Sequence, residues 1–213
     1  MTLKWIKNMR TVSNKRNWKI TLVIILGLFL ICQGNAQVKS GLYSNSLIFS
    51  VNQESSQVSG YLWRYIYNDD NPKLGIYQTC YLFFKGEYKN LQDTIKIDIY
   101  DCFNPIPIAR GSLLCNSNKI FFQTGSSIIS CMNTFDFQDG ESFELTKSIS
   151  IMFCSRIKIS KSFFYKEKRK TNEYLTKGDF VSILDIMNDL YLVQYIDNTG
   201  KTIEGWIKKS DVE

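Results

Sequence analysis

The chain has 213 residues, of which 44% are hydrophobic and 14% aromatic, and this composition excludes an intrinsically disordered protein. The net charge of +6 comes wholly from residues 1–36, which contain six Lys or Arg and no Asp or Glu, so that 20 basic and 20 acidic residues follow. Because the rest of the chain is neutral overall, we expect no nucleic-acid partner.

The first 36 residues have the order of a secretory signal peptide. A basic stretch, Lys15–Lys19, precedes the apolar run Ile20–Cys32. The small residues Gly34 and Ala36 then stand at the positions that signal-peptide cleavage before Gln37 requires. We therefore expect a signal-peptide helix over residues 1–36, cleavage after Ala36, and a secreted or periplasmic protein. The alternatives are an uncleaved anchor, which would be the chain's membrane contact, and a lipoprotein modified at Cys32, although the preceding Ile is unsuited to lipoprotein processing.

Residues 37–154 are predicted to form an all-β domain. Ile95, Ile97 and Ile99 alternate with Lys96 and Asp98, so one face of this strand is expected to be buried and the other wet. Other strand-like stretches lie, in chain order, at residues 46–53, 57–68, 78–89 and 119–125. Turn formers separate these stretches, and no helical apolar period follows the signal. We expect an antiparallel meander, closed as a β-barrel or folded as a sandwich.

The five cysteines beyond the signal are expected to form disulfides, because export leads to an oxidising compartment. Two disulfides and one buried thiol are the simplest arrangement. We expect Cys80 to pair with Cys131 and Cys102 to pair with Cys115, with Cys154 as the buried thiol, although other connectivities are open. No C-x-x-C spacing is present, so neither a zinc site nor a redox motif is indicated.

Residues 155–213 are predicted to form a second β domain, joined to the first without a flexible linker. Its pieces are the turn Gly178-Asp179, the run Val181–Leu184, the strand Leu190–Tyr195, and Gly205-Trp206-Ile207 followed by Ser210-Asp211-Val212. In this order they resemble a bacterial SH3-like domain over about residues 157–213. The resemblance implies a small β-barrel of the kind that secreted bacterial proteins are thought to use for cell-wall or peptide ligands. The first region loosely resembles the N-terminal halves of secreted Bacteroidetes-type proteins, from which no activity follows.

Four aromatic residues of the second domain are candidate ligand-binding residues: Tyr165, Tyr174, Tyr191 and Trp206. Eukaryotic SH3 domains hold proline-rich peptides in an aromatic groove, and these four side chains would line an analogous groove. The alternative is that two or three of them fill or cover the domain's core.

The sequence argues against most enzyme mechanisms. It contains no histidine, which excludes Ser-His-Asp and Cys-His catalysis, and it has no phosphate-binding glycine loop. We expect no metal and no cofactor. A carboxylate pair for glycoside hydrolysis is the remaining catalytic alternative. Its candidates are Asp136, Asp139, Glu141 and Glu144 in one cluster, and Asp98 with Asp101 in another.

These observations favour an exported, non-catalytic binding protein of the bacterial cell envelope. Its ligand would be a cell-wall fragment, a peptide or another protein, including an enzyme that it inhibits. A carboxylate-dependent envelope hydrolase and a structural envelope component are the alternatives.

Overall fold

Alternating side chains build the first sheet as the sequence predicts. In β5 (Ile95–Tyr100), Ile95, Ile97 and Ile99 are buried in the interior, while Lys96 between them is exposed. The computed structural model describes residues 38–67, 76–102, 104–128, 137–166, 169–197 and 200–213. The predicted signal-peptide helix lies outside these residues.

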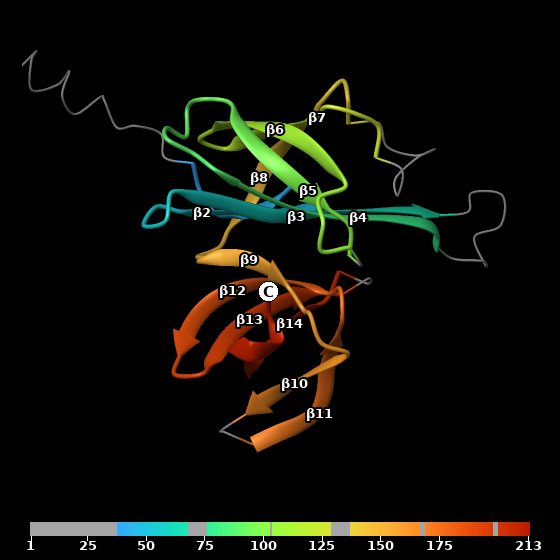
Figure 1. Ribbon diagram of the computed structural model, residues 1–213, viewed down its shortest axis with the longest axis vertical. Coiled ribbons are helices and arrows are strands. Elements are labelled where there is room, and N and C mark those ends of the chain that lie inside the picture. Colours follow the sequence, from blue (N-terminus) through green and yellow to red (C-terminus); the bar gives the residue numbers. More distant parts are fainter. Residues whose placement is uncertain (1–37, 68–75, 103, 129–136, 167–168, 198–199) are drawn as a thin grey trace, which may run out of the picture. The chain divides into compact units, whose positions relative to one another are not determined.

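Strands β1–β8 form a closed antiparallel barrel in which each strand pairs with the next and β1 pairs with β8 (Figure 1). The strands are β1 (Gly41–Tyr43), β2 (Leu47–Asn52), β3 (Gln57–Tyr67), β4 (Ile76–Glu87), β5, β6 (Ala109–Asn116), β7 (Lys119–Thr124) and β8 (Glu141–Ser148). Phe49, Leu82, Phe84, Phe122 and Phe143 are fully buried in its interior. The prediction of an all-β antiparallel meander is therefore confirmed, and of its two alternatives, barrel and sandwich, the barrel is observed.

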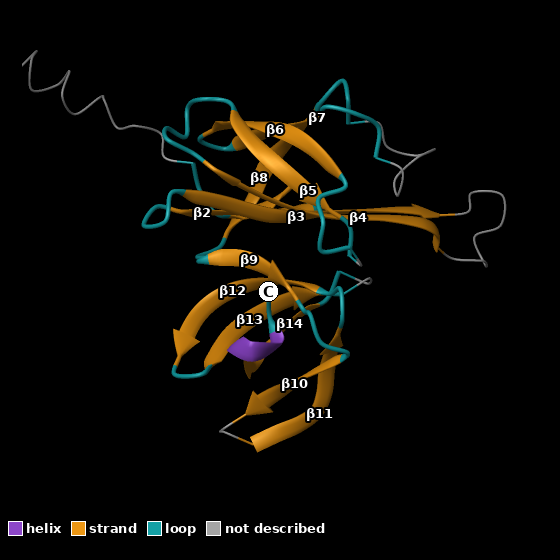
Figure 2. Ribbon diagram, in the orientation of Figure 1, coloured by secondary structure: helices purple, strands orange, loops and turns teal. Residues whose placement is uncertain are grey.

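A second antiparallel sheet follows, in the order β11-β10-β14-β13-β12-β9 (Figure 2). Its strands are β9 (Phe153–Arg156), β10 (Lys161–Lys166), β11 (Arg169–Thr176), β12 (Phe180–Met187), β13 (Leu190–Ile196) and β14 (Thr202–Lys208), followed by the 3-10 turn Lys209–Asp211. One face buries an apolar cluster that includes Phe164, Val181, Ile183, Val193 and Ile207. Because β9 begins at Phe153, the second sheet begins two residues before the boundary expected from the sequence.

A second apolar cluster packs the barrel against this sheet. The barrel supplies Ile48, Tyr61, Trp63, Phe83 and Tyr100, and the second sheet supplies Cys154 and Phe180. The ring of Phe180 lies 5.9 Å from that of Tyr61 and 5.8 Å from that of Phe83. The backbone N–H of Cys154 donates to Ser59 Oγ at 2.7 Å. Residues 38–213 accordingly form one compact unit.

The cysteines correct part of the predicted disulfide pattern. Cys102, Cys115 and Cys154 are free thiols, whereas Cys80 is disulfide-bonded. The predicted bridge between Cys102 and Cys115 is therefore wrong, because Cys115 points into the barrel core while Cys102 packs against the cluster between the two sheets. Cys154 is a buried thiol, as expected. Cys131 lies outside the described residues, so its pairing with Cys80 stays a prediction.

Across the described ranges, no helix has the length and apolar character needed to cross a membrane.

Candidate functional site

Strand register brings three of the four candidate aromatics onto one face of the second sheet. Directly paired residues of an antiparallel sheet share a face. Tyr165 of β10 pairs with Trp206 of β14, and Phe163 of β10 pairs with Tyr174 of β11. Ser162 and Phe164, which alternate with them in β10, are buried on the opposite side. We call this surface the Trp206 face; it comprises Phe163, Tyr165, Tyr174 and Trp206 with Lys161, Lys170 and Lys208.

Gly205 explains how Trp206 comes to lie outward. A Cβ atom at Gly205 would lie 2.6 Å from Cδ1 of Phe164, so the Phe164 ring packs directly over the backbone of β14. Ile207, the next residue on the same face as Gly205, is fully buried. Since side chains alternate along a strand, Trp206 between them projects to the other face. The Gly-Trp-Ile sequence thus places one large aromatic side chain on the outside of a tightly packed sheet.

Lysine ammonium groups lie over the rings of the Trp206 face. Lys161 Nζ lies 4.6 Å from the ring centroid of Tyr174, and Lys170 Nζ lies 3.5 Å from that of Phe163. Lys208 Nζ lies 6.0 Å from the ring centroid of Tyr165. Such cation–π contacts contribute about 0.5–1 kcal/mol each at exposed sites, so they favour lysine rotamers that lie over the rings.

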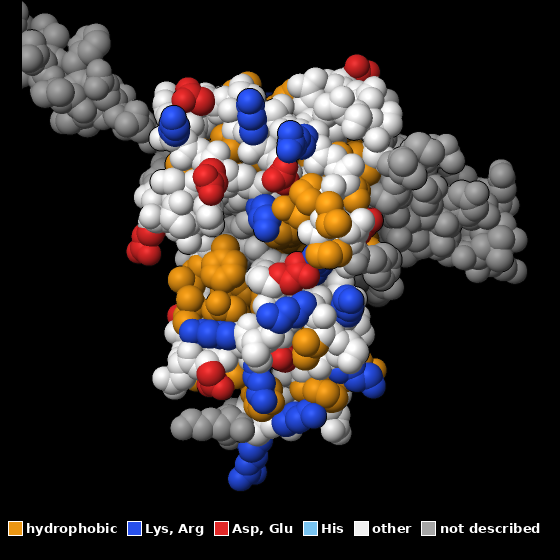
Figure 3. Space-filling view, in the orientation of Figure 1, with side chains coloured by type: hydrophobic (Ala, Val, Ile, Leu, Met, Phe, Trp, Pro, Cys, Tyr) orange, Lys and Arg blue, Asp and Glu red, His pale blue; other side chains and the backbone are white. Residues whose placement is uncertain are grey.

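Within the described ranges, no acidic side chain forms an ion pair with these lysines. The ion pairs found in the described part of the chain are Arg64–Glu141, Arg110–Asp98, Lys119–Glu144 and Arg156–Glu213, and none involves Lys161, Lys170 or Lys208. The surrounding segment, residues 161–177, contains six basic and two acidic residues. Figure 3 shows Lys and Arg side chains next to hydrophobic ones at the β10–β11 end. The Trp206 face therefore combines aromatic surface with positive charge, which suits a ligand that carries carboxylates beside apolar groups.

Tyr191 is separated from the other candidates. It pairs directly with Ile207, so it lies on the face of the sheet opposite Trp206. Its ring packs edge-on against Phe153 at 5.6 Å and borders the buried cluster. The structure thus brings Tyr165, Tyr174 and Trp206 together and leaves Tyr191 partly in the core, so that one of the four aromatics, rather than two or three, borders the core.

Sequence reasoning missed Phe163 and the three lysines of the Trp206 face. The alternation Lys161, Phe163, Tyr165 along one strand was a usable signal for β10. The contributions of Lys170 and Lys208 depend on the pairing register of three strands, which the sequence does not reveal. The register between β10 and β11 also shifts. Phe163 pairs with Tyr174, but Tyr165, two residues later in β10, pairs with Lys170, four residues earlier in β11.

Four of the described carboxylates that were candidates for glycoside hydrolysis each contact a different partner, and none of these contacts joins two of them. Asp98 Oδ1 lies 3.6 Å from Arg110 Nε, and Glu141 is paired with Arg64. The Lys119 ammonium 2.6 Å from Glu144 holds the pKa of that carboxyl below its usual range. Asp101 Oδ1 accepts a hydrogen bond from the Asn104 backbone at 2.6 Å. Asp139 is exposed, and Asp136 lies outside the described residues.

Burial makes the free thiols weak acids. Desolvation raises the pKa of Cys115 to about 12 in the barrel core and that of Cys154 to about 12 in the cluster between the sheets. The pKa of Cys102 is also raised, chiefly by desolvation and then by nearby Asp101. Thiolate chemistry at neutral pH is therefore disfavoured at these three sites. No group of three or more Cys, Asp or Glu side chains in the described ranges is arranged to hold a metal ion.

No protein-family model, curated protein or solved structure matches this chain.

Proposed function

We propose that the chain is an exported, non-catalytic binding protein of the bacterial envelope. The Trp206 face, as part of an SH3-like module, holds its ligand. The observation that supports this best is the cross-strand pair of Tyr165 and Trp206, flanked by lysines without carboxylate partners in the described part of the chain. Rings and ammonium groups held by strands form a preorganised surface, which lowers the entropy cost of binding.

The ligand class that fits this surface is an acidic peptide of the cell wall. Its carboxylates would meet Lys161, Lys170 and Lys208, and its apolar side chains would lie on the exposed parts of Tyr174 and Trp206. Tyr174 is 43% exposed, which leaves much of its ring free for contact. The N-terminal basic and apolar segment supports delivery to the envelope, where such peptides occur.

Co-sedimentation of the exported protein with purified peptidoglycan sacculi tests this proposal. We expect Trp206→Ala to weaken binding about tenfold or more, as for a central aromatic contact. Lys208→Ala is expected to weaken it about threefold, and raised salt should weaken it further, because the lysine contacts are exposed to solvent.

The matched control is Lys209→Ala. Lys209 neighbours Lys208 in the chain and also lies over a ring, with Nζ 5.3 Å from the centroid of Tyr191, outside the Trp206 face. Equal losses in Lys208→Ala and Lys209→Ala would contradict a site on the Trp206 face. Failure to sediment with sacculi, or tighter binding to single-stranded DNA, would overturn the proposed function itself.

A further inference from the structure

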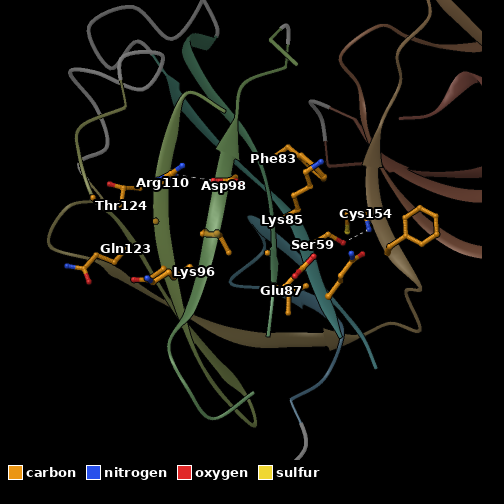
Figure 4. A pocket seen from close by; sticks show the side chains of 18 of the residues that line it. Ser59, Phe83, Lys85, Glu87, Lys96, Asp98, Arg110, Gln123, Thr124 and Cys154 are labelled. Atoms are coloured by element: carbon orange, nitrogen blue, oxygen red, sulfur yellow. Dashed lines mark hydrogen bonds and ion pairs between the residues drawn. The ribbon is translucent and has the colours of Figure 1, made fainter. Parts of the chain in front are cut away.

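A broad groove lies on the outer wall of the barrel, away from the Trp206 face. Its floor is formed by outward-facing side chains of β3–β7, and β9 forms one wall (Figure 4). The groove has a volume of about 1410 Å³. Since pockets for single small molecules usually measure about 300–1,000 Å³, this space is large enough for an oligomeric ligand.

The floor of the groove consists of rows of polar side chains set by strand register. In the first row, Ser59, Lys85, Asp98 and Arg110 are successive cross-strand partners from β3 to β6. In Figure 4, Lys85, Asp98 and Arg110 project from neighbouring strands on one side of the sheet. In the next row, Lys96, Ser112 and Gln123 are partners across β5, β6 and β7. Each row places a polar group on every strand, at intervals of about 4.8 Å.

The polar rows contrast with the adjoining part of the same wall. Phe83 is the neighbour of Lys85 on the same face of β4, and Tyr100 is the neighbour of Asp98 on the same face of β5. Phe83 and Tyr100 are only 8% and 7% exposed, because the second sheet covers them. Lys85 and Asp98 lie beyond that cover. The wall therefore changes from apolar where it is packed to polar where it is open, with hydrogen-bonding groups turned toward solvent.

The wall formed by β9 is fixed by a buried arginine. Arg156 is 4% exposed, and its Nη1 donates to the backbone carbonyls of Asp101 at 2.9 Å and Asn104 at 2.7 Å. Its Nε donates to Glu213 at 3.0 Å. These bonds satisfy the guanidinium and attach β9 to the segment that follows β5. Arg156 is thus a support for the groove rather than a ligand contact.

The barrel strands along the groove are paired on both sides, and part of the backbone of the edge strand β9 is also hydrogen-bonded, which argues against an added peptide strand. β4, β5 and β6 each pair with a neighbour on both sides. On β9, the N–H of Cys154 donates to Ser59, and the carbonyl of Arg156 accepts from Glu213 N at 3.1 Å. Peptide recognition by strand addition needs a free edge and apolar side-chain pockets. Here the ligand must be recognised by polar side chains on a sheet face.

We infer that this groove binds an oligosaccharide. A sugar hydroxyl both donates and accepts hydrogen bonds, and the floor supplies donors at Lys85, Lys96 and Arg110, an acceptor at Asp98, and groups of both kinds at Ser112 and Gln123. With Glu87 as a second carboxylate on the floor, three cations face two anions, which suits a neutral or weakly acidic glycan. This site is independent of the peptide site on the Trp206 face.

Isothermal titration of the exported protein with two soluble probes tests the inference. The probes are hexamers of β-1,4-linked N-acetylglucosamine and of β-1,4-linked glucose. We expect at least one probe to bind, and we expect Asp98→Asn and Gln123→Ala each to weaken that binding fivefold or more. Lys96→Ala should weaken it about threefold. The matched control is Lys119→Ala, which removes an exposed lysine of β7 outside the groove and should leave glycan binding unchanged.

The Trp206→Ala variant separates the two proposals, because it should lose sacculus binding through the peptide site and keep binding of the soluble glycan. Circular dichroism of each variant establishes that it is folded. Absence of binding by both probes would overturn the inference. It would also be overturned if glycan binding survived the groove variants and disappeared in Trp206→Ala.

Discussion

The hydroxyl of Tyr61 on β3 lies 3.2 Å from the hydroxyl of Ser182 on β12, and both side chains are buried. This hydrogen bond joins the outer wall of the barrel to the second sheet within the apolar cluster they share. The two sheets therefore depend on each other for part of their core. Coupled unfolding follows from this arrangement, because separating the sheets would expose Tyr61, Phe83 and Phe180 to water.

We expect the barrel and the second sheet to unfold in one transition. Trp63 lies in the barrel and Trp206 in the second sheet. In a protein that begins at Gln37, Trp206→Phe leaves Trp63 as the reporter for the barrel, and Trp63→Phe leaves Trp206 as the reporter for the second sheet. Urea unfolding followed by fluorescence should give coincident midpoints. Phe180→Ala should lower the free energy of unfolding by about 3–5 kcal/mol in both variants. Two separated transitions would show that the shared cluster does not couple the sheets.

Residues 38–213 should contain three free thiols. Alkylation in denaturant followed by mass spectrometry is expected to modify Cys102, Cys115 and Cys154, and to leave Cys80 in a disulfide that we predict to include Cys131. Under native conditions near neutral pH, Cys115 and Cys154 should be alkylated far more slowly than in denaturant, because both are buried. Modification of Cys154 alone would restore the pairing of Cys102 with Cys115 that the structure contradicts.

Stability should fall at alkaline pH because of the buried thiols. Burial raises the pKa values of Cys115 and Cys154 to about 12. The thiol of an unfolded chain has a pKa of about 8.5. Above that pH the unfolded chain releases protons that the folded chain retains, so the free energy of unfolding decreases. The slope should approach about 1.4 kcal/mol per pH unit for each thiol until the folded pKa is reached.

Urea unfolding at several pH values above 8 measures this slope. The double variant with Cys115→Ala and Cys154→Ala should show a shallower decrease than the wild type. Tyr43 and Tyr61, whose pKa values are also raised by burial, will add to the decrease at higher pH in both proteins. Equal slopes in the two proteins would contradict the assignment to the thiols.

Gly205→Ala should destabilise the protein by about 1–3 kcal/mol, because the new Cβ would overlap the Phe164 ring. Gly125→Ala is the matched control: the nearest atom to a Cβ there is the Arg110 carbonyl oxygen at 3.4 Å, an ordinary contact. Thermal unfolding of both variants checks the comparison. A loss of stability in Gly125→Ala equal to that in Gly205→Ala would rule out packing of Phe164 over β14 as the cause.

The strands could be predicted from local pattern. The alternation at Ile95, Ile97 and Ile99 predicted a strand with one wet face, and β5 has this arrangement. Residues Leu190–Tyr195 were predicted to form a strand, and β13 (Leu190–Ile196) includes all of them. In each case the periodicity of a single strand carries the information.

The sites depend on register between strands, which local pattern does not specify. Tyr191 and Trp206 look equivalent in the sequence, yet pairing places them on opposite faces of the second sheet. Cys102 and Cys115 are close enough in sequence for a bridge, but they face different apolar clusters. The groove combines residues of seven strands, and its polar side chains show in the sequence only as the exposed positions of ordinary strands.

We propose above that the Trp206 face holds an acidic cell-wall peptide. Two-dimensional NMR of a protein that begins at Gln37, titrated with soluble stem peptides from peptidoglycan, tests this proposal most directly. We expect the largest shifts at the Trp206 indole N–H and at the amides of Tyr165 and Lys170, with little change at Tyr191. Shifts centred on Tyr191 and Phe153, or no shifts at saturating peptide, would contradict the claim.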